Sequence, residues 1–116
     1  MIGKHLLADF YGVASETLND TSLLNECLIQ AAGCCGLTPL GVPRLHPFEG
    51  GGVTGFLLLA ESHIALHTYP EHNFMTLDIL SCGKAEPKAA LAIFENALNP
   101  TSVETTQVSR GGQVLL

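Results

Sequence analysis

Two neighbouring segments alternate side chains of opposite character with a period of two, and this pattern limits the fold more than any other feature of the chain. In residues 63–69, HIALHTY, the histidines, the alanine and the tyrosine fall on one side of an extended backbone, and the isoleucine, leucine and threonine fall on the other. Residues 75–82, MTLDILSC, alternate in the same way until Gly83 ends the run. Because successive side chains of a strand point to opposite faces, both segments are predicted to be β-strands.

The other strands are predicted from apolar, aromatic and β-branched residues that lie between turn residues. They are expected at residues 5–11, at 37–45 with a break at Pro43, at 53–60 after the glycines 50–52, and at 101–109. Residues 15–21 are polar, and no element is predicted there.

Two helices complete the prediction. The first has its cap within residues 20–22, carries apolar side chains at helical spacing, and ends at Gly33 or Gly36. The second begins at Pro87, where a missing N–H costs nothing, and ends at the pair 99–100, Asn-Pro.

This order of elements predicts an α+β fold: a two-layer sandwich of one mainly antiparallel sheet with two helices on one face. The run 56–59, FLLL, is apolar on both sides of a strand. The sheet face away from the helices therefore needs a cover, and we expect a second protomer packed sheet against sheet, in the layer order αββα.

The composition is that expected of a single small domain that associates with other copies of itself. The 116 residues suffice for one domain, and 47% of them are apolar while only 14% are charged, with a mean hydropathy of +0.31. Such a chain is expected to bury apolar surface between copies. Eleven acidic residues against five basic ones leave no positive cluster for phosphates, so we expect no nucleic-acid partner.

No segment predicts a membrane or an export signal. The longest apolar runs are shorter than the roughly 18 residues that span a bilayer, and Asp9 interrupts the hydrophobic N-terminal stretch. The cysteines at 27, 34, 35 and 82 form no C-x-x-C pair or spaced zinc set, which fits reduced thiols in a cytoplasm.

Residues 60–71, AESHIALHTYPE, concentrate reactive side chains. Ser62 follows an apolar run, as turn serines often do, and no G-x-S-x-G surrounds it, so a hydrolase triad is not supported. His63 and His67 could bind zinc together with Cys82, although each histidine could equally be a hydrogen-bonded residue at a sheet edge.

The chain resembles the short bacterial class of S-adenosylmethionine decarboxylases, pyruvoyl-dependent lyases of polyamine synthesis. The resemblance rests on GKHLLADFYG at 3–12, the glycine-rich turn at 49–52, AESHIALHTYPE at 60–71 and LDILSCG at 77–83. It covers nearly the whole chain. It implies a single domain over residues 1–116, made as a proenzyme, that converts S-adenosylmethionine to its decarboxylated form and carbon dioxide for spermidine synthesis.

The resemblance also implies that the chain cuts itself between Glu61 and Ser62. The Ser62 hydroxyl would attack the Glu61 carbonyl to give an ester, and β-elimination followed by hydrolysis would leave a pyruvoyl group at the head of residues 62–116, with residues 1–61 as the second chain. This covalent cofactor would form a Schiff base with the substrate amine and accept the electrons released with carbon dioxide.

Three residues receive chemical roles from the resemblance. His67 assists the self-cleavage, and Cys82 supplies the proton to the carbon that loses its carboxylate. Thr54 stands where the family commonly has a serine that helps processing, and its hydroxyl is held by a stiffer side chain.

Three others receive substrate contacts. Phe48 matches an aromatic residue that stacks on the adenine, and Glu71 matches the carboxylate that binds the ribose hydroxyls. Tyr69 stands where HTWPE sequences have a tryptophan. Without the resemblance, Phe48 would be expected to cover the core and Glu71 to be a solvated loop carboxylate.

The resemblance implies a homodimer with two shared sites. Ser62 and His67 are five residues apart, so a regular strand would point them to opposite faces and one chain would build the site poorly. In the implied dimer, Ser62 and Cys82 of one protomer meet Thr54, His67, Phe48 and Glu71 of the other.

Two alternatives stay open from the sequence. The same scaffold could decarboxylate arginine or ornithine instead of the nucleoside substrate. A chain of another class would be a non-catalytic dimeric binding module with zinc on His63, His67 and Cys82, and it would stay in one piece.

Overall fold

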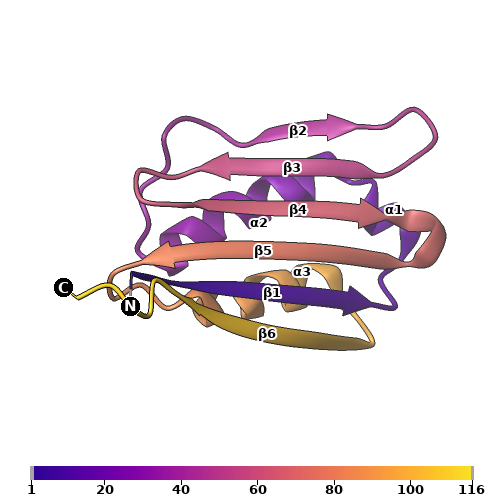
Figure 1. Ribbon diagram of the computed structural model, residues 1–116. Helices are drawn as coiled ribbons and strands as arrows, with labels where there is room; N and C mark the ends of the chain where they lie inside the picture. The colour runs from indigo at the N-terminus through magenta and orange to yellow at the C-terminus, as the bar shows by residue number, and fades with distance from the viewer. Residues whose placement is uncertain (1, 116) are drawn as a thin grey trace.

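The computed structural model describes residues 2–115 and contains one six-stranded sheet with helices on one face (Figure 1). Its strands are β1 (Gly3–Tyr11), β2 (Arg44–Pro47), β3 (Val53–Leu58), β4 (His63–Tyr69), β5 (Phe74–Cys82) and β6 (Ser102–Arg110). The spatial order is β2-β3-β4-β5-β1-β6, and every neighbouring pair is antiparallel. The predicted α+β sandwich is confirmed.

The helices are α1 (Ser15–Leu18), α2 (Thr21–Cys34) and α3 (Leu91–Leu98), with two short 3-10 helices, η1 (Pro70–His72) and η2 (Pro87–Ala90). The Asp20 carboxylate caps α2 by accepting from the Leu23 N–H at 3.1 Å. Gly36 follows the end of α2 with a φ of +69°, as predicted for one of the two candidate glycines. No helix in residues 2–115 is long and apolar enough to cross a membrane.

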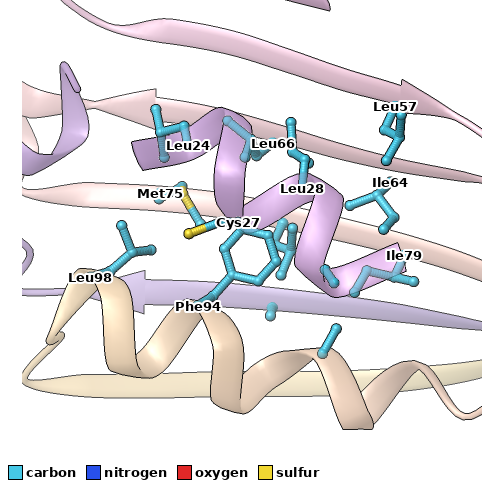
Figure 2. Close-up of a cluster of buried hydrophobic side chains, with 14 of the residues drawn as sticks. Leu24, Cys27, Leu28, Leu57, Ile64, Leu66, Met75, Ile79, Phe94 and Leu98 are labelled. Atoms are coloured by element: carbon cyan, nitrogen blue, oxygen red, sulfur yellow. The ribbon is translucent and has the colours of Figure 1, made fainter. Parts of the chain in front are cut away.

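The core lies between the helices and one face of the sheet. Figure 2 shows Phe94 of α3 close to Cys27 of α2, above the strands that supply Leu66 and Met75. The alternation that predicted β4 and β5 explains this arrangement, because the inward-facing residues of both strands are buried. Burial of this apolar surface is the main favourable term in folding.

The other sheet face has no helix over it among residues 2–115, and it carries large apolar side chains beside polar ones. Six large side chains on this face keep between 36% and 51% of their surface exposed: Leu7, Tyr11, Phe56, Leu58, Tyr69 and Val108. We call this the uncovered face. Several large apolar side chains exposed on one face are typical of a protein interface.

Two sequence predictions about the elements were wrong. Residues 37–45 do not form a strand: only a single bridge joins Pro39 to Leu59, and β2 begins at Arg44. Pro39 and Pro43 lack the N–H that a continuous ladder needs, and Gly41 has a φ of +95°. The other error is α1, which lies within the polar residues 15–21, where no element was predicted.

Candidate functional site

The segment between β3 and β4 is a tight turn, which we call the Leu59–Ser62 turn. The Leu59 N–H donates to the Ser62 carbonyl at 3.0 Å, and the Ser62 N–H donates back to the Leu59 carbonyl at 3.3 Å. Only Ala60 and Glu61 lie between these two residues. The Glu61–Ser62 peptide bond therefore lies at the end of a two-residue loop, at the end of the sheet where the chain leaves β3 and enters β4 (Figure 1).

Cys82 lies beside this peptide bond. Its thiol donates to the Glu61 carbonyl oxygen at 3.3 Å, from the last residue of β5. The Ser62 hydroxyl oxygen is buried and has no hydrogen-bond partner among residues 2–115. The structure thus places the predicted Ser62 and Cys82 together, with an unpaired hydroxyl next to the carbonyl that it would attack.

Gly3 allows β1 to approach Cys82 closely. A Cβ at this position would lie 2.5 Å from the Ser81 carbonyl oxygen and 3.6 Å from the Cys82 sulfur. The first distance is too short for two nonbonded heavy atoms, so only glycine leaves β5 and Cys82 where they are.

Thr38 contacts the Leu59–Ser62 turn through two hydrogen bonds, and no pattern in the sequence indicates this role. Its carbonyl accepts from the Ala60 N–H at 2.8 Å, and its own N–H donates to Glu61 Oε1 at 3.4 Å. Thr38 was predicted to lie in a strand, and only its contact with Glu61, 23 residues away in the sequence, shows that it supports the turn.

The predicted substrate-binding residues gather elsewhere, together with the two residues predicted to assist processing. Phe48, Thr54, His67, Tyr69 and Glu71 line one cavity of about 220 Å³. The Thr54 hydroxyl and His67 Nδ1 are 3.2 Å apart, on adjacent positions of β3 and β4. One group of the predicted site residues is therefore assembled within a single chain.

A buried hydrogen-bond network supports this cavity. Gly52 has a φ of +99° and donates its N–H to Asn19 Oδ1 at 2.8 Å, in the segment that joins α1 to α2. The Thr68 hydroxyl accepts from the Val53 N–H and donates to the Leu18 carbonyl, both at 2.8 Å. The glycine-rich turn and the first residues of β3 are thus fixed by the helical segment that the sequence did not predict.

The two groups lie at opposite ends of the sheet. Ser62 precedes β4 and His67 is five residues further, which corresponds to about 17 Å along a strand. In Figure 1 the β3–β4 turn is at the left, at one end of the strands, while the β2–β3 turn is at the right, at the other end, together with the segment between β4 and β5 that contains η1. Because Ser62 lies outside the strand, distance rather than the alternation of faces separates it from His67.

The zinc alternative is not supported. His67 pairs with Thr76 in β5, and Cys82 is six residues further along that strand. Within residues 2–115, no group of three His, Cys, Asp or Glu side chains is placed to hold a metal ion.

Two other cysteines are more deeply buried than Cys82. Burial raises the pKa of Cys27 to about 11, and burial also raises the pKa of Cys35. These two thiols therefore stay protonated near neutral pH, and Cys82 is half-buried at a strand end. The sulfurs of Cys34 and Cys35 donate to backbone carbonyls around η2.

Comparisons with known proteins identify the family. Residues 4–111 match the family model described as S-adenosylmethionine decarboxylase. The chain is 40% identical to the S-adenosylmethionine decarboxylase proenzyme of Thermoplasma volcanium, over 97% of this chain and 87% of the relative. It is 37% identical to the proenzyme of Brevibacillus brevis, over 94% and 82% of the two chains.

A solved structure gives the same result. The crystal structure of the adenosylmethionine decarboxylase from Aquifex aeolicus superposes with a TM-score of 0.85 and 33% identity, covering 95% of this chain and 91% of that one. The relatives include archaeal as well as bacterial proteins. The chain belongs to the S-adenosylmethionine decarboxylase family.

Proposed function

We propose that this chain is a proenzyme that cleaves itself and then decarboxylates S-adenosylmethionine. One observation carries the proposal: the buried, unpaired Ser62 hydroxyl lies in a tight turn whose Glu61 carbonyl accepts a hydrogen bond from Cys82. The proenzyme names of the relatives agree with self-processing. No comparison supports the arginine or ornithine alternative.

Self-cleavage uses groups of the chain alone. The Ser62 oxygen bonds to the Glu61 carbonyl carbon, the C–N bond breaks, and the hydroxyl proton passes to the amide nitrogen, which leaves an ester. The Cys82 thiol is placed to stabilise the negative charge that develops on the Glu61 oxygen. Loss of the Ser62 α-proton then expels the Glu61 carboxylate, which carries away the serine oxygen and leaves a dehydroalanine. A proton taken up at its Cβ converts the dehydroalanine to an imine, and water hydrolyses the imine to a ketone with release of ammonia.

The products are residues 1–61 and residues 62–116, the second headed by a pyruvoyl group. The surroundings of Ser62 fit this group, because the side chain whose Cα and Cβ would become its ketone and methyl carbons is already buried, beside the Glu61 carbonyl that Cys82 contacts. Once formed, the pyruvoyl group supplies a ketone that binds an amine and accepts electrons. The chain's part in decarboxylation is to hold the substrate and to deliver the Cys82 proton to its α-carbon.

Substrate recognition is assigned to the cavity at the other end of the sheet. Phe48 is 52% exposed and offers an aromatic face for the adenine, with Tyr69 on the same cavity. The exposed Glu71 carboxylate can accept from both ribose hydroxyls. The cavity of about 220 Å³ is smaller than the roughly 300 Å³ from which small-molecule sites usually start, so a second surface must complete it.

That second surface is proposed to be another copy of the chain. Packing two uncovered faces together buries the six large apolar side chains on each. An antiparallel arrangement brings the Leu59–Ser62 turn of one protomer to the cavity of its partner. This gives a homodimer with two shared sites.

A cytoplasmic location is also proposed. All four cysteines of the chain are free, including the neighbouring Cys34 and Cys35. Free thiols persist in a reducing compartment.

Denaturing mass spectrometry of the purified protein tests the proposal. The expected result is two fragments, divided between Glu61 and Ser62, with a pyruvoyl group on the second. The Ser62→Ala chain keeps the fold but lacks the nucleophile, and it should remain whole. Carbon dioxide should be released from S-adenosylmethionine but not from arginine or ornithine. A wild-type chain that stays whole after long incubation contradicts the proposal.

A further inference from the structure

Four side chains form a continuous row across the uncovered face, next to the Leu59–Ser62 turn. Arg110, His5, His63 and Phe56 come from β6, β1, β4 and β3. Arg110 Nη1 lies 3.3 Å from His5 Nδ1. The His5 and His63 ring centroids are 6.1 Å apart at 89°, and His63 stacks on Phe56 at 5.7 Å and 18°.

The contact with Arg110 fixes the state of the His5 ring. A guanidinium can only donate, so His5 Nδ1 must accept and carries no proton. In the neutral ring the proton is then on Nε2. This Nε2 atom is buried and has no hydrogen-bond partner among residues 2–115.

The strand register explains why His5 reaches His63. Leu80 of β5 pairs with His5 on one side and with His63 on the other, so the two rings flank a leucine. Edge-to-face contacts of aromatic rings at this separation are favourable. With Phe56 on its other side, the His63 ring is held between two aromatic neighbours.

His63 is bonded directly to Ser62, so the contacts that hold His63 also bear on the orientation of Ser62. We infer that a His63 ring held in this way limits the backbone rotation that turns the Ser62 hydroxyl toward the Glu61 carbonyl. The reaction depends strongly on this orientation, because small misplacements of reacting groups reduce rates by large factors.

We propose that Arg110 and His5 are positioning residues for self-cleavage, and that they act by holding His63 and, through it, the Glu61–Ser62 bond against Cys82. The inference rests on the proposed function and deepens it. Neither residue touches the reacting atoms. The competing explanation is that the row only stabilises the sheet.

Single variants separate these two explanations. His5→Phe keeps a ring beside His63 but removes the acceptor for Arg110, and Arg110→Ala removes the donor. His5→Asn keeps an oxygen that can take the place of Nδ1. Lys4→Ala is the matched control, because it breaks a 2.8 Å ion pair with Glu86 one position away from His5 on the same strand.

Each full-length chain is made in a cell-free system, and the intact fraction is followed over time on denaturing gels. His5→Phe and Arg110→Ala are expected to cleave at least about tenfold more slowly than wild type, His5→Asn to recover most of the rate, and Lys4→Ala to cleave normally. Urea unfolding of each chain on a Ser62→Ala background, which remains whole, measures stability separately. Nitrogen-15 NMR of His5 should show the Nε2–H tautomer, and Arg110→Ala should lose this preference.

Three outcomes contradict the inference. Arg110→Ala cleaving at the wild-type rate overturns it, even if His5→Phe fails to fold. Rates that fall only in proportion to stability, with Lys4→Ala falling equally, assign the row to structure alone. A wild-type chain that stays whole overturns the proposed function together with this inference, whereas a cleaving wild type with unaffected variants overturns the inference alone.

Discussion

Thr54 Oγ1 and His67 Nδ1 are 3.2 Å apart, and both residues lie on the uncovered face toward the end of the sheet opposite Ser62. A pair so placed cannot assist the cleavage of its own chain without a large rearrangement. It can assist the cleavage of a partner whose turn lies over it. This separation makes the proposed shared site testable by mixing defective chains.

Co-expression of Ser62→Ala and His67→Ala chains should restore cleavage. In the mixed dimer, one of the two sites contains the intact Ser62 of the His67→Ala chain and the intact His67 of its partner. Random pairing places about half of the His67→Ala chains in such dimers, so up to that fraction should be cleaved. Mass spectrometry distinguishes the two variants by mass.

The matched control combines His67→Ala with Thr54→Ala. Both changes fall on the same group of residues, so no mixed site contains the complete set, and cleavage should stay at the level of the separate variants. Restoration in this control as well would contradict the shared site, as would failure of the Ser62→Ala mixture.

Replacing Cys82 should slow self-cleavage. Cys82→Ala removes the donor to the Glu61 carbonyl, and loss of one donor to a developing oxyanion typically lowers a rate by 10²- to 10³-fold. Cys82→Ser keeps a donor with a shorter reach and should be intermediate. Timed denaturing gels measure the rates. An alanine variant that cleaves as fast as wild type would limit Cys82 to the decarboxylation step.

Thr68→Val should destabilise the fold by about 2–4 kcal/mol. The substitution preserves shape but leaves the buried Val53 N–H and Leu18 carbonyl without their 2.8 Å partner. Urea unfolding, on a Ser62→Ala background to avoid cleavage, provides the measurement. Thr105→Val on the exposed strand β6 is the control and should change stability by less than about 0.5 kcal/mol. Equal effects of the two substitutions would show that the Thr68 network contributes little.

The sequence predicted the strands whose two faces differ. β4 matches its predicted bounds, and β5 begins one residue earlier than predicted, because one buried face forces alternation. The prediction of a strand at residues 37–45 was wrong. The composition of this segment resembles that of a strand, but its prolines and a positive φ prevent the backbone from pairing continuously.

The candidate site was predicted in its residues but not in all of its contacts. Resemblance supplied Ser62 and Cys82, whereas no local pattern relates Thr38 to Glu61 or Arg110 to His5. Those pairs are 23 and 105 residues apart, and only the order of strands in the sheet brings them together. Helix α1 was missed because four residues are too few for a periodic signal.

Alkaline pH should destabilise the protein partly through Cys27. Its pKa is raised to about 11 by burial, while an unfolded thiol ionises near 8.5, so between these values the unfolded chain has lost a proton that the folded chain retains. Stability therefore falls as pH rises across this window, by at most about 1.4 kcal/mol per pH unit for one thiol. Urea unfolding of uncleaved Ser62→Ala protein between pH 8 and pH 11 measures the slope.

Cys27→Ala should make this slope shallower, even though the smaller side chain lowers stability at every pH. Cys34→Ala is the control, because it removes an exposed thiol from the end of the same helix and leaves the buried thiol in place. Cys35 and Tyr11 also have raised pKa values, from burial and from a hydrogen bond to Glu104 respectively, and they contribute to the slope in the same direction. If Cys27→Ala and Cys34→Ala both show the same change of unfolding free energy with pH as the unsubstituted chain, ionisation of Cys27 does not cause the loss of stability at high pH.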